Sequence, residues 1–406
     1  MLRPGAIANA AGSACPRSDG REPTAILLHH QRGEIMNRRE FLGSSLTAGA
    51  VLAAGTHSLG AAQATTAQQS TPATASLKKL PIGVFNPPFR KLSLDEMLDL
   101  YVSMGIEAAE IGAPGYTGTP QCPAPDLIAD PAKAKAWKKK FDDRGIPIMT
   151  LTCHANPLYP DTVKGPKFAQ QFKDAIQLAG MLEIPTVCGF SGCPASSATE
   201  ITPAWVVYNW PPEHAATLKW QWEERVIPYW KDIAQFASDH GVKRIALEMH
   251  PNMVVYNART LMRLRDAVGD VIGANCDLSH MFWQGCDAVE LIRYLGKQGA
   301  MYHAHMKDTA FFPQNVDRFG VLNFGLTTDK EASECFRTVG YGHGASEWKD
   351  VMAAYMEIGY DGMISIENED ALLSGEEGVR RGLTLLKNVR EELLAGHTNP
   401  GEHVSA

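Results

Sequence analysis

The sequence predicts an α/β fold, a closed (β/α)8 TIM barrel with long loops after its fourth and seventh strands. Two observations predict it. Eight short apolar runs alternate with amphipathic stretches, and this alternation is typical of parallel sheets. Several of the amphipathic stretches end at a glycine just before the next run, at Gly105, Gly145 and Gly241, as a left-handed helix cap requires. A single barrel with insertions reaches 406 residues, so the length does not demand two domains.

The apolar runs are the predicted strands of the barrel. They begin at Leu80, Ile106, Ile146, Pro185, Arg244, Ile272, Met301 and Met363. The helical patterns between them include residues 93–105, 166–182, 225–241 and 287–296.

Two connections, residues 191–217 and 309–345, are too long for simple turns. Because both follow strands, we expect them on the face where barrel enzymes build their active sites. Their aromatic side chains either stack on a sugar or an aromatic aglycone, or pack on the barrel or at a subunit interface. These residues are Trp205, Tyr208, Trp210, Phe311, Phe312 and Phe319.

The N-terminal region predicts export. Residues 36–64 join Arg38-Arg39 to a mildly hydrophobic segment and then to Ala62-Gln63-Ala64, which is typical of a twin-arginine signal peptide. The apolar part is too short for a membrane span. We therefore expect a periplasmic or secreted mature protein. Residues 1–35 are interpreted as an over-long N-terminal extension, 65–79 as a linker, 80–394 as the barrel and 395–406 as a C-terminal tail.

Composition excludes some classes of function. The net charge is −7, with 38 basic and 45 acidic residues, so nothing indicates a nucleic-acid-binding surface. Seven of the eight cysteines follow the predicted signal, an odd number without a C-x-x-C pair. A full disulfide framework is therefore not expected. A homo-oligomer is compatible with the sequence.

Acidic and imidazole groups gather on the predicted fifth to eighth strands. Side chains alternate along a strand, so the polar residues of each strand share one face. These faces carry Glu248 and His250, Asn275 and Asp277, His303, His305 and Lys307, and Glu367 and Glu369. The opposite faces are apolar, as at Ile245 and Leu247 or Ile364 and Ile366. The polar faces should therefore point into the barrel.

Unpaired carboxylates inside a barrel are costly, by several kcal/mol each. A divalent cation would neutralise them. Three carboxylates with one imidazole form an oxygen-rich set that suits Mn²⁺, with Mg²⁺, Co²⁺ or Zn²⁺ as alternatives. Taken singly, a Glu or His at a strand end is more often a hydrogen-bonded structural group, but the set from four strands indicates a metal site.

These strand ends resemble the xylose isomerase-like sugar phosphate isomerase/epimerase superfamily. The matching segments are ALEMHP, NCDLSH, HAHMKD and SIENED, and the resemblance covers about residues 80–394. In ketose epimerases of this superfamily the corresponding residues bind a metal, which implies Glu248, Asp277, His305 and Glu367 as ligands. The resemblance also implies that Glu248 and Glu367 exchange protons with a carbohydrate substrate and that His280 lies beside it. His303 is the rival of His305 as a ligand and is also a candidate substrate contact.

One departure from the epimerases concerns substrate contact. They carry an arginine six residues after the metal-binding histidine, where this chain has Phe311. In its place Lys307 and Asp308 offer a charged pair, and His154 after the third strand is a candidate base or substrate contact. Trp283 is either a wall or a sugar-stacking platform. His250 is either a substrate contact or a brace for Glu248.

Four hypotheses follow. The first is a metal-dependent isomerase or epimerase of a free sugar or sugar derivative, acting by proton abstraction next to a carbonyl. The second is a metal-dependent lyase, because the chain also resembles barrel subunits that eliminate the aglycone from 3-keto-glycosides. The third is a metal-stabilised binding protein without turnover. The fourth is an endonuclease of the same superfamily, which the acidic net charge disfavours.

Overall fold

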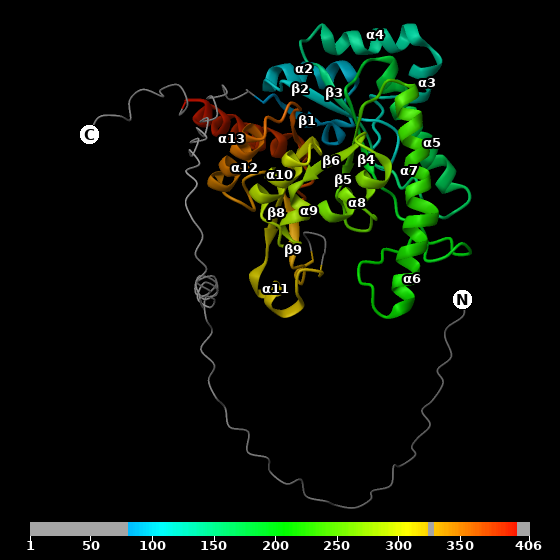
Figure 1. Cartoon of the computed structure of the whole chain (residues 1–406). Helices are drawn as coiled ribbons and strands as arrows, with labels where there is room; N and C mark the ends of the chain where they lie inside the picture. Colours follow the sequence, from blue (N-terminus) through cyan, green and yellow to red (C-terminus); the bar gives the residue numbers. More distant parts are fainter. Residues whose placement is uncertain (1–79, 324–328, 396–406) are drawn as a thin grey trace, which may run out of the picture. The chain divides into compact units, whose positions relative to one another are not determined.

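The apolar runs form eight parallel strands that close into a barrel (Figure 1). The computed structural model describes residues 80–323 and 329–395. Neighbouring strands follow the order β1-β10-β7-β6-β5-β4-β3-β2 around the barrel. The predicted fold is therefore confirmed, with all eight predicted strands present. They are β1 Ile82–Phe85, β2 Ala108–Gly112, β3 Ile148–Cys153, β4 Thr186–Phe190, β5 Arg244–Glu248, β6 Ile272–Asp277, β7 Met301–Met306 and β10 Ile364–Ile366.

The helices surround this barrel (Figure 1). Those that follow strands as the main crossovers are α2 Leu94–Met104, α4 Pro131–Asp142, α5 Lys164–Met181, α7 Ile227–Asp239, α8 Ala258–Val268, α10 Ala288–Lys297, α12 Ala345–Glu357 and α13 Gly375–Ala395. Shorter segments are η1 Pro87–Phe89, α3 Ala124–Ala129, α6 Pro212–Trp220, the π-helical η2 Gln221–Val226, α9 Leu278–Phe282 and α11 Pro313–Phe319.

Local sequence signals fix where helices begin and end. The Ser93 side chain accepts a hydrogen bond from the backbone N–H of Glu96 and the Glu96 side chain accepts one from that of Ser93, a capping box that starts α2. Gly105 ends the same helix with φ 69°. Gly145 and Gly241 also have positive φ angles, 67° and 75°. The predicted left-handed caps are thus confirmed.

The main hydrophobic core lies between the strands and the surrounding helices. The predicted outward-facing residues Ile245, Leu247, Ile364 and Ile366 are all buried in it. Helices α12 and α13 pack against each other and cover one side of the barrel (Figure 1). With the apolar faces turned outward, the polar faces of β5, β6, β7 and β10 are left for the barrel interior.

The two long connections differ in structure. After β4 the chain runs without regular structure to α6, which continues through η2 into α7. After β7 it forms an unpredicted antiparallel hairpin of β8 Asp308–Phe311 and β9 Glu334–Arg337, with α11 between the two strands. Figure 1 shows α6 and α11 projecting from the same end of the barrel.

Some predictions concern segments that the structure leaves undescribed. The predicted N-terminal extension, signal peptide and linker lie outside the described residues, as does the tail after Ala395. Among the described residues, no helix is both long and apolar enough to cross a membrane. All seven cysteines there are free thiols.

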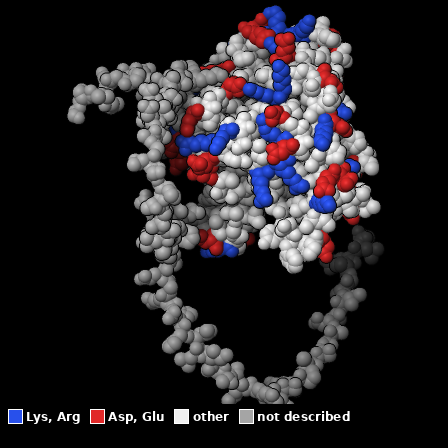
Figure 2. All heavy atoms as spheres, in the orientation of Figure 1, with Lys and Arg blue, Asp and Glu red and all other residues white. Residues whose placement is uncertain are grey.

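Figure 2 shows basic and acidic side chains interspersed over one face of the described part. Several form surface ion pairs on the lysine-rich helix α4, including Lys140 with Asp95 and Lys138 with Asp142. The lysines of this helix therefore belong to a mixed-charge surface.

Candidate metal centre

Four ionisable side chains meet at the carboxyl ends of neighbouring strands. Glu248 ends β5, Asp277 ends β6, His305 lies one residue before the end of β7 and Glu367 directly follows β10. The strand register pairs Asp277 with His305 and His305 with Ser365. One donor atom from each of the four residues lies within 4.8 Å of the others, and all four residues are buried. We call Glu248, Asp277, His305 and Glu367 the four-residue cluster.

The His305 ring contacts two of the three carboxylates of the cluster. Its Nδ1 lies 3.1 Å from Glu367 Oε2 and 3.4 Å from Glu248 Oε2. In the third carboxylate only one oxygen accepts a hydrogen bond. Asp277 Oδ1 accepts the backbone N–H of Ser279 at 2.9 Å and so caps the N-terminus of α9. Within the described residues, Asp277 Oδ2 accepts no hydrogen bond. The cluster therefore holds a buried carboxylate oxygen that accepts no hydrogen bond, although positively charged or ionisable groups lie 3.4 Å (His280 Nε2) and 3.6 Å (Lys307 Nζ) from it.

The electrostatics of the cluster favour a bound cation. Burial raises the pKa of Asp277, which lies close to the like charges of Glu248 and Glu367. Burial would lower the pKa of His305, but the carboxylates of Glu110 and Glu367 hold it well above its ordinary value. The site thus draws positive charge to itself. Three carboxylates and one imidazole, with one carboxylate oxygen that accepts no hydrogen bond, are a donor set that fits a divalent metal ion.

Lys307 already supplies one positive charge. Its Nζ lies 3.2 Å from Glu367 Oε2 and 3.6 Å from Asp277 Oδ2, and it also pairs with Glu369. Burial would lower the pKa of Lys307, but these carboxylates, Glu367 first, hold it well above the ordinary value. Its ammonium group also lies 4.2 Å from the centre of the Phe336 ring. The structure therefore places Lys307 at the cluster, as the sequence predicts.

Two predicted histidines contact Glu248. His154 Nε2 lies 2.9 Å from Glu248 Oε2, and the His154 ring stacks on Phe190 with centroids 4.3 Å apart. His280 Nε2 lies 3.3 Å from Glu248 Oε1. Both rings therefore adjoin the carboxylate that is predicted to act on substrate.

His250 differs from its predicted role as a brace for Glu248. Its Nδ1 faces the carbonyl oxygen of Pro251, and its ring packs against His280 with centroids 4.3 Å apart. Burial, with the adjacent His280, lowers the pKa of His250 to about 3. His250 is thus a neutral ring that supports His280. It also lines the cavity described below, so the predicted substrate contact is compatible with its position.

His303 does not belong to the four-residue cluster. Its Nε2 lies 2.8 Å from Glu110 Oε2 and its Nδ1 lies 3.2 Å from the Thr150 hydroxyl. Both ring nitrogens are therefore engaged inside the barrel. This geometry favours His305 over His303 as the cluster's imidazole, and it does not support the predicted substrate contact of His303.

Glu110 is the main site residue that the sequence analysis missed. It is fully buried on β2 and reaches across the barrel to both His303 and His305. Burial would raise the pKa of Glu110, but the two imidazoles hold it well below its ordinary value. The sequence signal that could have identified Glu110 is a single carboxylate within the otherwise apolar segment AAEIG.

Asp308 also differs from its predicted role. Its carboxylate accepts backbone N–H groups from Gly340 and Gly342, both at 2.9 Å, and the ring Nδ1 of His343 lies 2.8 Å away. Asp308 is fully buried. It therefore anchors the long loop after β7, and the geometry does not support the prediction that it binds substrate.

A cavity of about 460 Å³ adjoins the cluster through His280. Trp283 lines it, as the sequence predicts, and so do Glu334 and Phe336 from the unpredicted strand β9. Of the six aromatic residues predicted to line the active-site face from the two long connections, only Trp205 lines this cavity. Tyr208 and Trp210 are instead 74% and 68% exposed.

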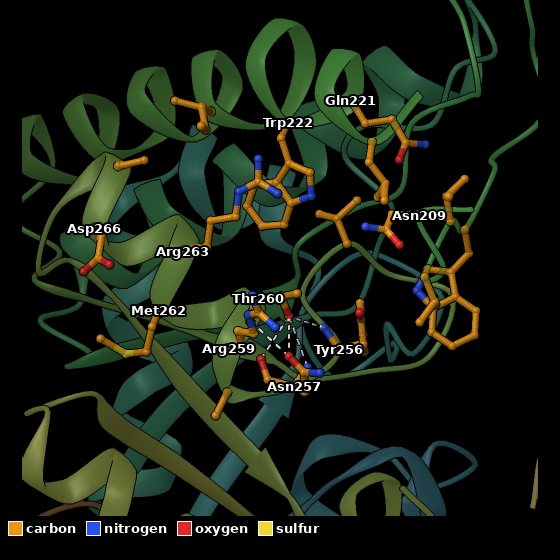
Figure 3. Close-up of a pocket in the computed structure, with 18 of the residues that line it drawn as sticks. Asn209, Gln221, Trp222, Tyr256, Asn257, Arg259, Thr260, Met262, Arg263 and Asp266 are labelled. Atoms are coloured by element: carbon orange, nitrogen blue, oxygen red, sulfur yellow. Dashed lines mark hydrogen bonds between the residues drawn. The ribbon is translucent and has the colours of Figure 1, made fainter. Parts of the chain in front are cut away.

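A larger hollow lies elsewhere. Figure 3 shows this groove of about 1290 Å³ between η2 and α8, where Arg263 lies over the Trp222 ring at 4.1 Å. None of its lining residues belongs to the four-residue cluster. Trp205 borders both hollows. Size alone therefore does not locate the chemistry in this fold.

Comparison with known proteins decides the family. The model of the xylose isomerase-like TIM barrel family matches residues 98–389. The chain belongs to this family. The uncharacterized protein YfiH of Bacillus subtilis (strain 168) is 33% identical over 304 residues, which cover 73% of this chain and 95% of YfiH.

Solved structures share the fold of this xylose isomerase-like barrel at low sequence identity. A xylose isomerase domain protein from Planctomyces limnophilus is 18% identical with a TM-score of 0.54, covering 79% of this chain and all of that one. The 3-keto-D-glucoside 4-epimerase YcjR of E. coli is 13% identical with a TM-score of 0.51, covering 76% and 100%. An L-ribulose 3-epimerase is also 13% identical with a TM-score of 0.51, covering 79% and 99%.

Proposed function

We propose that this protein is a divalent-metal-dependent isomerase or epimerase of a free sugar or sugar derivative. The observation that carries the proposal is the four-residue cluster, in which three buried carboxylates and one imidazole converge within 4.8 Å. Glu248, Asp277, His305 and Glu367 would hold the ion, with Mn²⁺ the best match to an oxygen-rich set. When bound, the ion would supply Lewis-acid stabilisation of negative charge on a substrate oxygen.

Glu248 and Glu367 are suited to exchange protons with a substrate carbon. They come from β5 and β10, which β6 and β7 separate in the barrel, so they enter the cluster from different sides. One carboxylate can remove the proton next to a carbonyl while the other returns it, which inverts or shifts the stereocentre. His154 and Asn275 hold Glu248 at 2.9 and 3.2 Å, and Lys307 holds Glu367.

The test combines metal analysis with proton exchange. Purified protein loaded with Mn²⁺ is incubated with ketoses in deuterated water, and NMR follows deuterium entering the carbon next to the carbonyl. We expect one bound metal per chain and exchange that E248Q or E367Q slows by about 10²–10⁴-fold. E347Q, the same change on the exposed first turn of α12, is the control and should match wild type.

Two results would contradict the proposal. Wild-type protein that binds no divalent metal would remove its basis. Wild-type protein that binds metal and sugar but never exchanges a proton would favour the metal-stabilised binding protein.

A second candidate is a metal-dependent lyase that eliminates the aglycone from 3-keto-glycosides. The observation that favours it is the aromatic wall of Trp205, Trp283 and Phe336 beside the cluster, in a cavity large enough for a group beyond one sugar ring. The E. coli structural neighbour is named for a 3-keto-D-glucoside, so this substrate class belongs in the panel. With p-nitrophenyl 3-keto-glucoside, released nitrophenol indicates the lyase and an isomeric glycoside indicates the epimerase.

A further inference from the structure

We propose that Glu110 is a positioning residue that fixes the His305 ring so that Nδ1 faces the four-residue cluster. The proposal rests on the proposed metal site and names a residue outside it. Glu110 is on β2, three strands away from β7 around the barrel, and its carboxylate reaches His305 through the interior.

The His305 ring lies between two groups of carboxylates. Its Nε2 is 3.0 and 3.1 Å from the two oxygens of Glu110, while its Nδ1 is 3.1 Å from Glu367 Oε2. A neutral imidazole has one N–H and one lone pair, and a carboxylate only accepts. Donation of the Nε2 hydrogen to Glu110 therefore leaves the Nδ1 lone pair toward the cluster, where a metal ion can take it.

Glu110 cannot easily turn away from this role. The Thr152 hydroxyl donates to Oε1, the Ser365 hydroxyl donates to Oε2, and His303 Nε2 donates to Oε2 at 2.8 Å. Together with His305, four donors from β3, β7 and the eighth barrel strand β10 hold one carboxylate. All of these residues are at most 1% exposed. Such a fully satisfied buried network is rigid.

The same contacts explain the H-A-H sequence of β7. The Thr150 hydroxyl lies 3.2 Å from His303 Nδ1, so this ring can accept there and donate from Nε2 to Glu110. The first histidine holds the carboxylate, and the carboxylate holds the second histidine. Both carboxylate oxygens of Glu110 already accept hydrogen bonds from these four donors. This favours a role in positioning the His305 ring over the binding of a second metal ion by Glu110.

The experiment measures metal affinity and the state of the ring in the full-length chain. Competition of the purified protein with a fluorescent chelator gives the affinity for Mn²⁺. We expect E110Q to bind Mn²⁺ about 10–100-fold more weakly than wild type, the usual effect of removing the partner of a metal-binding histidine. E347Q, the same change on the exposed first turn of α12, is the matched control, and its affinity should stay close to wild type.

NMR of metal-free protein labelled with ¹⁵N-histidine supplies a reading that does not depend on activity. At a pH high enough to give the neutral ring, wild type should show the Nε2–H form of His305, and E110Q should show the Nδ1–H form or exchange between the two. H305Q identifies the signal. Should E110Q be too unstable to purify, E110D keeps the charge with a shorter reach and should show an intermediate affinity.

Each contrary outcome has a separate meaning. An E110Q protein with wild-type Mn²⁺ affinity and the same protonated form of the His305 ring as wild type would overturn the proposal that Glu110 positions this ring. Two bound metal ions per wild-type chain, one of them lost in H303Q, would overturn it in favour of a second site. A wild-type chain that binds no metal would refute the proposed function, while the NMR comparison would still decide whether Glu110 sets the His305 ring.

Discussion

Glu334 is a buried carboxyl group that lacks the partners found around Glu110. It lies on β9, is 2% exposed and lines the cavity beside the cluster. Its Oε2 accepts no hydrogen bond from the described residues. Burial raises the pKa of Glu334 to about 7, against the opposing effect of the His280 and Lys307 charges. Around neutral pH this group is therefore partly protonated and able to donate a hydrogen bond.

The raised pKa predicts how stability changes with pH. The folded chain binds the Glu334 proton more tightly than the unfolded chain does. Protonated Glu334 therefore adds to the free energy of unfolding at low pH, and this stabilisation is lost as pH rises from about 4.5 to about 7. E334Q cannot ionise and should remove this loss, which stabilises the protein at pH 8 by about 1–3 kcal/mol.

Urea unfolding of wild type and E334Q at pH 4 and pH 8 measures this effect. The two proteins should be nearly equal at pH 4, below the unfolded pKa, and differ at pH 8. Equal stability at both values would show that Glu334 ionises normally in the folded chain.

The residues at strand ends differ in how well sequence could place them. Glu248, Asp277, His305 and Glu367 each end or follow an apolar run, where strand alternation and barrel topology give their position. Glu110 sits inside such a run, and its two histidine partners are nearly two hundred residues away. Distant contacts of this kind leave no local pattern. The neutral packing of His250 and the anchoring by Asp308 likewise depend on backbone groups that only the folded loops supply.

At the scale of the elements, Gly241 offers a clean test of a helix end. It follows α7 with φ 75°, and a methyl group added there would meet no atom within 4 Å. The cost of Gly241→Ala therefore comes from the backbone conformation alone. We expect a loss of about 1–2 kcal/mol in the free energy of unfolding, measured by thermal or urea unfolding.

Gly241→Asn provides the matched comparison for this helix end. Asparagine tolerates the left-handed conformation better than alanine, so its loss should be smaller. Equal losses for the two variants would mean that side-chain packing, and not the φ angle, sets the cost.

The strands of the barrel were predictable because each is a short apolar run bounded by a helix. The β8–β9 hairpin was not, for a physical reason. Its strands pair Asp308–Phe311 with Glu334–Arg337. The connection between them is long and contains α11. Pairing over such a distance depends on the anchoring of the loop by Asp308 and not on alternation within either strand. The hairpin nevertheless supplies Glu334 and Phe336 to the cavity, so this part of the candidate site was beyond sequence patterns.

For the whole molecule, the cysteines predict insensitivity to reductant. All seven in the described part are free, and six of them are buried. Burial raises the pKa of Cys122 and Cys276 to about 12, so these thiols stay protonated and unreactive. The melting temperature with and without dithiothreitol should be the same. A lower melting temperature in reductant would indicate a stabilising disulfide and would contradict the free thiols of the described residues.

Free buried thiols also suit a protein that folds before it leaves a reducing compartment, which is what the Arg38-Arg39 signal predicts. We propose that the chain is exported already folded, so that its buried cluster can take up metal beforehand. Replacing Arg38 and Arg39 by lysine should keep the protein in the cytoplasm, whereas Arg32→Lys, outside the predicted signal, should not. Cell fractionation, with N-terminal sequencing of the exported form near Thr65, measures both. The twin-arginine pathway, which accepts folded proteins, is predicted to need Arg38 and Arg39. Export of the lysine variant at the wild-type level would therefore contradict this route.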